Sequence, residues 1–135
     1  MATLITVAPV LTPTQFDLTI RAGVTLWAEF ESLLDNGTAL DVTTATLAAE
    51  VRATDGRLLA TLVPFVVESQ TSGRFAVRLP QVLATQVFED FREFFPARWS
   101  CKAQFAGTFL GQSSFRLAEG AVNLLDRQTE SAASP

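Results

Sequence analysis

The sequence has no histidine, no tyrosine and only one cysteine among its 135 residues. The lone Cys101 cannot form an intrachain disulfide, so packing alone must stabilise the fold. Without histidine, the common zinc ligand sets cannot be assembled, and a serine nucleophile would have no histidine base. The seven glycines are dispersed and form no phosphate-binding loop. We therefore predict a protein that is not an enzyme and that binds neither a metal nor a cofactor.

Basic charge and long apolar runs are also scarce. Ten scattered lysines and arginines stand against fourteen acidic residues, a formal net charge of −4 that lacks the basic footprint of a nucleic-acid-binding protein. No apolar run approaches the roughly 18 residues that a membrane-spanning helix needs. The N-terminus has no basic region and is interrupted by Pro9 and Pro13, so it is a poor secretory signal. We predict a soluble chain made in the cytoplasm, without a nucleic-acid or membrane partner.

Alternation of apolar and polar residues is the clearest pattern present. In the stretch from residue 16 to residue 30, FDLTIRAGVTLWAEF, it continues on both sides of Ala22 and Gly23. A period of two places one set of side chains in a core and the other towards solvent. Two strands are therefore predicted, at residues 15–21 and 24–34, with a corner between them.

The same alternation recurs along most of the chain. Further strands are predicted at residues 45–53, 58–67, 74–79, 97–105, 113–117 and 122–124, with turns at 35–37, 55–56, 69–73, 106–108 and 119–120. Pro64 indicates an edge or a bulge, because proline cannot donate to a ladder. Seven to nine short strands with one short helix are typical of an antiparallel sandwich or barrel, and we predict the sandwich. It spans residues 15–125, after an N-terminal arm or edge strand (1–14) and before a flexible tail (126–135).

Residues 80–95, PQVLATQVFEDFREFF, break the alternation. Apolar residues recur there at spacings of three and four, which predicts one short amphipathic helix that ends before Pro96. The stripe comprises Val82, Leu83, Val87, Phe88, Phe91 and Phe95. Between them, Glu89, Asp90 and Glu93 form the densest acidic cluster of the chain. This cluster could bind a cation, but a solvated helix face explains it more simply.

Eleven phenylalanines and two tryptophans are the unusual feature of the composition. Five phenylalanines fall on inward strand positions and are predicted to be core, as is Cys101: Phe16, Phe30, Phe75, Phe105 and Phe115. One short helix cannot easily bury all four of its phenylalanines, Phe88, Phe91, Phe94 and Phe95, against one sheet. They are therefore either fully buried or the candidate protein interface of this chain. Trp27, which alternates with Leu26, is a second candidate for a surface covered by a neighbour.

Five segments occur in an order that resembles a known family. They are DLTIRAG (17–23), LLDNGTALDVT (33–43), AEVRATDG (49–56), GRFAVRL (73–79) and FRLAEGAVNL (115–124). The chain is similar to small immunoglobulin-like β-sandwich proteins of tailed bacteriophages, and in particular to the N-terminal domain of baseplate upper proteins. Two departures stand out: Trp99 and Phe105 occupy a strand where that family carries a tyrosine, and the segment before it is longer and richer in phenylalanine.

The resemblance implies an immunoglobulin-like sandwich that is a virion structural protein of the tail, baseplate or fibre-attachment region. Its partners would be other virion proteins and copies of itself, assembled in the host cytoplasm, and it carries over no catalytic residue. A capsid decoration protein is an alternative of the same class. A carbohydrate-binding module for host glycans is an alternative of another class, and it requires Trp27 or Trp99 on an open face with polar neighbours.

Overall fold

The computed structural model describes residues 10–109 and 112–126. Within them the chain forms eight strands, one α-helix and one 3₁₀ helix. In chain order these are β1 (Thr14–Gln15), β2 (Leu18–Arg21), β3 (Leu26–Glu31), β4 (Thr46–Arg52), β5 (Leu58–Val66), β6 (Arg74–Leu79), α1 (Gln81–Phe91), η1 (Arg92–Phe94), β7 (Ala97–Phe109) and β8 (Gln112–Leu125). The prediction of a mainly β chain with one short helix is confirmed.

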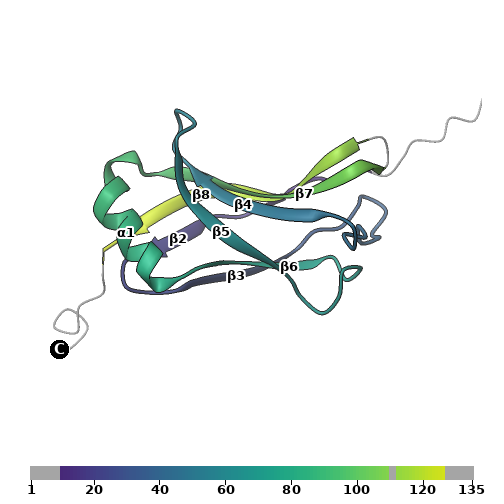
Figure 1. The fold of residues 1–135 in the computed structure, drawn as a ribbon, viewed down its shortest axis with the longest axis horizontal. Coiled ribbons are helices and arrows are strands. Elements are labelled where there is room, and N and C mark those ends of the chain that lie inside the picture. The colour runs from purple at the N-terminus through teal and green to yellow at the C-terminus, as the bar shows by residue number, and fades with distance from the viewer. Residues whose placement is uncertain (1–9, 110–111, 127–135) are drawn as a thin grey trace, which may run out of the picture.

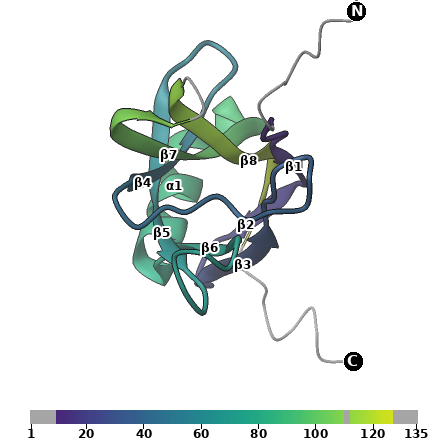
Figure 2. The ribbon, with the colours of Figure 1, turned by 90° about the vertical axis from the view of Figure 1, so that its right-hand side faces the viewer.

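The eight strands form one mixed sheet that curls round on itself. Its order is β1-β8-β7-β4-β5-β6-β3, and β2 also pairs with β8. β5 joins the two layers, because its first half pairs with β4 and its second half pairs with β6. Figure 1 shows β3 and β6 in a layer below β4, β7 and β8, with β5 crossing between them. Viewed from the end in Figure 2, the strands nearly enclose the core as in a barrel.

The sandwich predicted from the sequence is wholly antiparallel, and the structure differs at the N-terminal end of the chain. β1 and β2 run parallel to β8, whereas the other strand pairs are antiparallel. The backbone of Phe16, between β1 and β2, donates its N–H to Glu119 in β8 at 3.1 Å. The predicted arm at 1–14 lies mostly outside the described residues, and its described part forms a bridge from Leu11 to Leu34.

Two of the predicted turns are wrong. Residues 119–120 lie inside β8, and Gly120 is needed there for a close approach: a Cβ atom on it would stand 1.7 Å from the carbonyl oxygen of Phe16. Residues 106–108 lie inside β7, whose pairing with β8 extends from Ala97 to Phe109 with shifts in register. The turns predicted at 35–37 and 55–56 are confirmed by backbone hydrogen bonds that close them.

Aromatic side chains form the centre of the core. Trp99 is 2% exposed, and its ring meets those of Phe16 and Phe30 at centroid distances of 4.9 and 5.9 Å. Phe30 also stacks on Phe75 at 5.7 Å. All five predicted core phenylalanines pack in the core: Phe30, Phe75, Phe105 and Phe115 are buried, and Phe16 is partly buried against them.

The helix α1 covers one end of the curled sheet (Figure 1). It packs through Ala84 and Val87, which are buried. Its first half is fixed to the loop between β2 and β3, because the backbone N–H of Gly23 donates to Thr85 Oγ1 at 2.8 Å. Pro80 occupies the N-cap position just before the helix, and no side-chain hydrogen bond caps the helix start. The helix predicted at 80–95 is therefore confirmed, with η1 as its distorted end.

Candidate interaction surface

The four helix phenylalanines predicted as an interface are all partly buried. Phe91, Phe94 and Phe95 pack against the core. Phe94 is also covered by the guanidinium of Arg57, which lies 4.7 Å from the ring centroid. Phe88 is near the guanidinium of Arg92 at 5.5 Å. Each ring is thus partly covered within the chain, and their role in binding a partner stays a prediction.

Two grooves border these phenylalanines. One has a volume of about 560 Å³, lies between the helical segment and the ends of β2 and β8, and is lined by Phe88, Phe95 and Leu125 among others. The other, of about 460 Å³, lies between α1 and the first half of β5. Phe91 lines it together with Leu83, Asp90 and Leu58. The helix therefore contributes to two concave surfaces rather than to one continuous apolar face.

The most exposed apolar side chains of the helix are not phenylalanines. Val82 is 76% exposed and Leu83 is 41% exposed. Leu83 lines the second groove together with the exposed Leu58. The sequence places Val82 and Leu83 on the same apolar stripe as Val87. Because α1 packs through Ala84 and Val87, the start of that stripe is left facing solvent.

A second candidate surface, with both apolar and charged side chains, lies on the outward side of β3, β6 and β5, and we call it the outer sheet face. It consists of the outward residues Trp27, Glu29, Glu31, Val63, Phe65, Arg74, Ala76 and Arg78. Trp27 is 49% exposed, and its ring meets that of Phe65 at a centroid distance of 5.4 Å and an interplanar angle of 35°. We call these two side chains the aromatic pair.

The aromatic pair spans a strand. Trp27 belongs to β3 and Phe65 to β5, and β6 runs between these strands. Their rings can meet only by leaning across β6, whose outward residue beside Phe65 is the small Ala76. Ala76 is 0% exposed although it belongs to the outer side of the sheet, so the neighbouring side chains cover it. A small residue at this position is therefore what lets the two rings touch.

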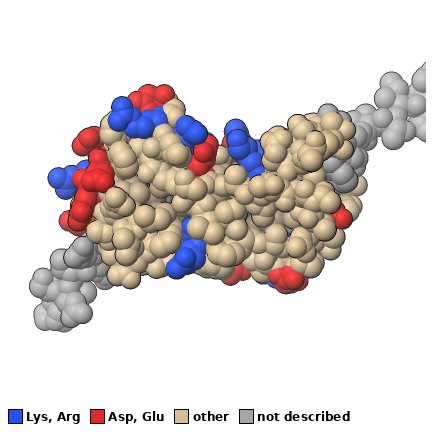
Figure 3. Space-filling view, viewed as in Figure 1, with Lys and Arg blue, Asp and Glu red and all other residues tan. Residues whose placement is uncertain are grey.

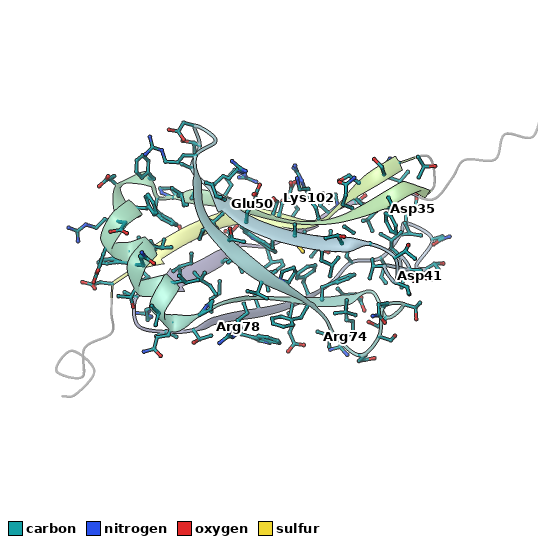
Figure 4. All side chains as sticks on the ribbon, viewed as in Figure 1. Asp35, Asp41, Glu50, Arg74, Arg78 and Lys102 are labelled. Carbon is teal, nitrogen blue, oxygen red and sulfur yellow. The ribbon has the colours of Figure 1, made fainter. Side chains whose placement is uncertain are left out.

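Charged side chains surround the aromatic pair in an ordered way. The outward acids, Glu29 and Glu31, are on β3, and the outward bases, Arg74 and Arg78, are on β6. The indole N–H of Trp27 donates to Glu29 Oε2 at 3.0 Å. Arg74 pairs with Glu68 and lies 4.0 Å from Glu29. Figure 4 shows Arg74 and Arg78 on one side of the molecule and Glu50 and Lys102 on the opposite side.

The acidic residues predicted on the helix, Glu89, Asp90 and Glu93, do not form a group that could hold a metal ion. Figure 3 shows acidic side chains over the end of the molecule that α1 covers, while much of the visible face is uncharged. Within residues 10–109 and 112–126, no group of three or more aspartates, glutamates or cysteines could hold a metal ion.

Glu50, on the far side from the outer sheet face, has a lowered pKa because Arg52 donates hydrogen bonds to its carboxylate.

The remaining predicted residues lie in the core. Burial raises the pKa of the Cys101 thiol to about 12, so the thiol stays protonated at neutral pH and is a poor nucleophile. Trp99 is buried, and its indole N–H donates to the carbonyl oxygen of Phe16 at 3.0 Å. Trp99 therefore cannot stack on a sugar, whereas Trp27 meets the condition of an open face with polar neighbours.

Comparison with known proteins gives this chain no family. No protein-family model matches it, and no curated protein matches it. Among the described residues, no helix is both long and apolar enough to cross a membrane. Function is therefore proposed from the surfaces described above and from the resemblance in the sequence.

Proposed function

We propose that this chain is a non-enzymatic structural protein of a tailed-phage virion, located in the tail, baseplate or fibre-attachment region. The order of the five segments within residues 16–125 supports the virion setting. The observation that carries the binding role is the outer sheet face, where Trp27, Val63 and Phe65 stand exposed beside one another. An immunoglobulin-like sandwich is part of this proposal, with β3 and β6 in one layer and β4, β7 and β8 in the other.

The composition of the outer sheet face is the physical reason to expect that it binds a partner. Tryptophan, phenylalanine and arginine are enriched in interfaces between proteins, and tryptophan and arginine are among the types that contribute most to binding. Removing apolar surface from water contributes about 25 cal/mol per Å², so covering an aromatic pair stabilises a complex appreciably. The charges around the pair form the polar rim that such interfaces have. The partners are other virion proteins and copies of this chain.

The location is tested by the composition of purified particles. Virions isolated by density gradient are analysed by quantitative mass spectrometry, before and after tails are separated from heads. We expect this chain in the tail fraction, at a fixed ratio to the other tail proteins. A fixed ratio in the head fraction would instead identify a capsid decoration protein. Absence from both fractions would contradict a virion role.

A carbohydrate-binding module is the second candidate, and Trp27 is the observation that favours it. Its exposed ring has Glu29 and Arg78 as polar neighbours, and aromatic faces of this kind stack on sugars. Titration of the chain with host surface glycans, followed by tryptophan fluorescence, tests it. Saturable quenching that disappears in Trp27→Ala would support glycan binding, and constant fluorescence would count against it.

A further inference from the structure

We infer that the outer sheet face binds a second copy of this chain around a two-fold axis that runs along the strands between β3 and β6. The inference rests on the proposed function and names the partner of this face. A two-fold interface joins the same patch on both copies, so the patch must be complementary to itself. The arrangement of charges on this face meets that requirement.

The charges are sorted by strand. On β3, the outward positions after Trp27 are Glu29 and Glu31, both acidic. On β6, the charged outward positions are Arg74 and Arg78, both basic. The register joins them in rows across the sheet: Glu31 stands opposite Arg74, and Trp27 stands opposite Arg78. The β3 half of the patch is therefore negative, and the β6 half is positive at Arg78 and at Arg74, whose guanidinium also pairs with Glu68 of its own chain.

A two-fold axis parallel to the strands places the β3 half of one copy against the β6 half of the other. Each row of residues keeps its position along the strand direction. β3 of one copy then faces β6 of the other, with the sheets about 10 Å apart. Glu31 meets Arg74 of the second copy, and the symmetric contact repeats the same pair. Trp27 meets Arg78 of the second copy, an arrangement in which a guanidinium lies over an indole ring.

The other in-plane axis, perpendicular to the strands, is disfavoured by the same charges. It would place β3 against β3, so that Glu29 and Glu31 of the two copies would face one another. Arginines would likewise face arginines on β6. Like charges brought together in this way weaken binding, which is how charged interfaces reject a wrong arrangement. The charge pattern therefore selects one orientation.

The aromatic pair lies close to the selected axis. Its rings lean over β6 in the rows of Arg78 and Ala76, beside the line between β3 and β6. The pair of one copy therefore packs against the pair of the other, with Glu31 and Arg74 one row beyond. A central aromatic cluster inside a charged rim is the usual anatomy of a specific interface.

Charge reversal followed by mixing tests this geometry. Wild-type chain, Glu31→Arg and Arg74→Glu are compared by sedimentation equilibrium, each alone and then as an equimolar mixture of the two variants. We expect each variant alone to dimerise at least about tenfold more weakly than the wild type, because like charges then face one another. The mixture should recover the wild-type affinity, because every cross-copy contact again joins an acid and a base.

Controls separate this interface from general effects of charge and folding. Lys102→Glu reverses a charge on the opposite side of the molecule (Figure 4) and should leave dimerisation unchanged. Trp27→Ala should weaken the dimer without changing any charge. The protected thiol of Cys101 reports that each variant is folded.

Three results would overturn the inference. They are a wild-type chain that is monomeric at all concentrations, a dimer insensitive to Trp27→Ala and both reversals, or a mixture no tighter than its components. A monomer whose Trp27 is quenched by a glycan would identify a sugar as the occupant. None of these outcomes decides whether the chain is in virions, which the composition of particles tests separately.

Discussion

Trp99 and Phe16 are joined by a hydrogen bond although 83 residues separate them in the chain. The indole N–H of Trp99 donates to the carbonyl oxygen of Phe16 at 3.0 Å, at the point where the N-terminal segment runs beside β8. This bond and the ring contact at 4.9 Å hold the first strands against the core. A buried tryptophan therefore supports the parallel edge of the sheet, in addition to the backbone pairing of β1 and β2 with β8.

Replacing Trp99 by phenylalanine should destabilise the fold. The substitution leaves the Phe16 carbonyl without its donor and leaves a gap in the core, at a cost of about 1–3 kcal/mol for the lost bond alone. Urea unfolding followed by circular dichroism measures the change. Trp27→Phe is the matched control, and its effect should stay within about 0.5 kcal/mol because Trp27 is half exposed. Equal losses for the two variants would contradict this assignment.

Gly120→Ala should be among the most destabilising small substitutions. Its Cβ would stand 1.7 Å from the Phe16 carbonyl oxygen, so the backbone between β1 and β2 must move. We expect a loss of at least about 1–3 kcal/mol in the free energy of unfolding. Gly107→Ala is the control, because a Cβ added there would have open space around it and the backbone is not left-handed. Similar thermal midpoints for both variants would refute the close approach.

Ala76→Leu should separate the aromatic pair without unfolding the sheet. A larger side chain on the outer side of β6 would occupy the space across which Trp27 and Phe65 meet. The Trp27 emission should shift to longer wavelength, and any function of the outer sheet face should weaken. Ala48→Leu, at an exposed position of β4, is the control. An unchanged spectrum in Ala76→Leu would show that Ala76 does not set the ring contact.

Cys101 should be unreactive in the folded chain. Its pKa is raised to about 12 by burial, and it is 0% exposed, so thiolate is scarce and reagents have no access. Labelling by a maleimide at pH 8 should therefore proceed at the rate of unfolding and become fast in denaturant. Rapid labelling of the native protein would show that this part of the core opens.

Stability should fall in acid through surface carboxylates. The pKa of Glu50 is lowered from its ordinary value of 4.5 by hydrogen bonds from Arg52, and the pKa of Glu119 is lowered by those from Gln15 and Arg116. A depressed pKa contributes stability that is present above the ordinary value of 4.5 and is lost as the pH falls through the folded value. The thermal midpoint should decline below that pH, and less steeply in Glu50→Gln. Identical slopes of thermal midpoint against pH for the wild type and Glu50→Gln would show that Glu50 does not contribute to the loss of stability in acid.

Local spacing was sufficient to predict much of the fold. The alternation at 97–105 placed Trp99 and Cys101 inside, and both are buried. The parallel pairing of β1 and β2 with β8 could not be predicted from the sequence. The paired residues, such as Leu18 and Val122, lie far apart in the chain, and no local pattern indicates the relative direction of their strands. Gly120 looks like a turn glycine in the sequence, but in the structure it allows the backbone of Phe16 to approach β8 closely.

The candidate site was only partly predictable for a similar reason. The alternation with Leu26 indicated that Trp27 faces outward, and its exposure confirms this. Residues 58–67 are apolar nearly throughout, which predicts a strand that is buried on both faces or covered by a partner on one of them. Period two cannot show which face Val63 and Phe65 take, and the structure leaves both exposed. Ala84 and Val87 are the buried residues of α1, which packs against β2 and β5. The spacing of residues within the helix does not reveal these packing partners.

The two candidate surfaces can be separated by paired substitutions. Trp27→Asp places a charge in the outer sheet face, and Phe91→Asp places one in the groove beside α1. We expect Trp27→Asp to abolish self-association and Phe91→Asp to alter stability more than self-association, because Phe91 packs against the core. Loss of self-association in Phe91→Asp alone, with an intact fold, would move the interface to the helix phenylalanines.

The central claim is that this chain assembles through exposed apolar surface, and light scattering of the purified chain tests it most directly. Multi-angle light scattering is recorded over a wide range of concentrations. We predict a mass that rises from the 14.6 kDa of one chain to a plateau at twice that value. A mass of 14.6 kDa at every concentration would contradict self-assembly through the outer sheet face.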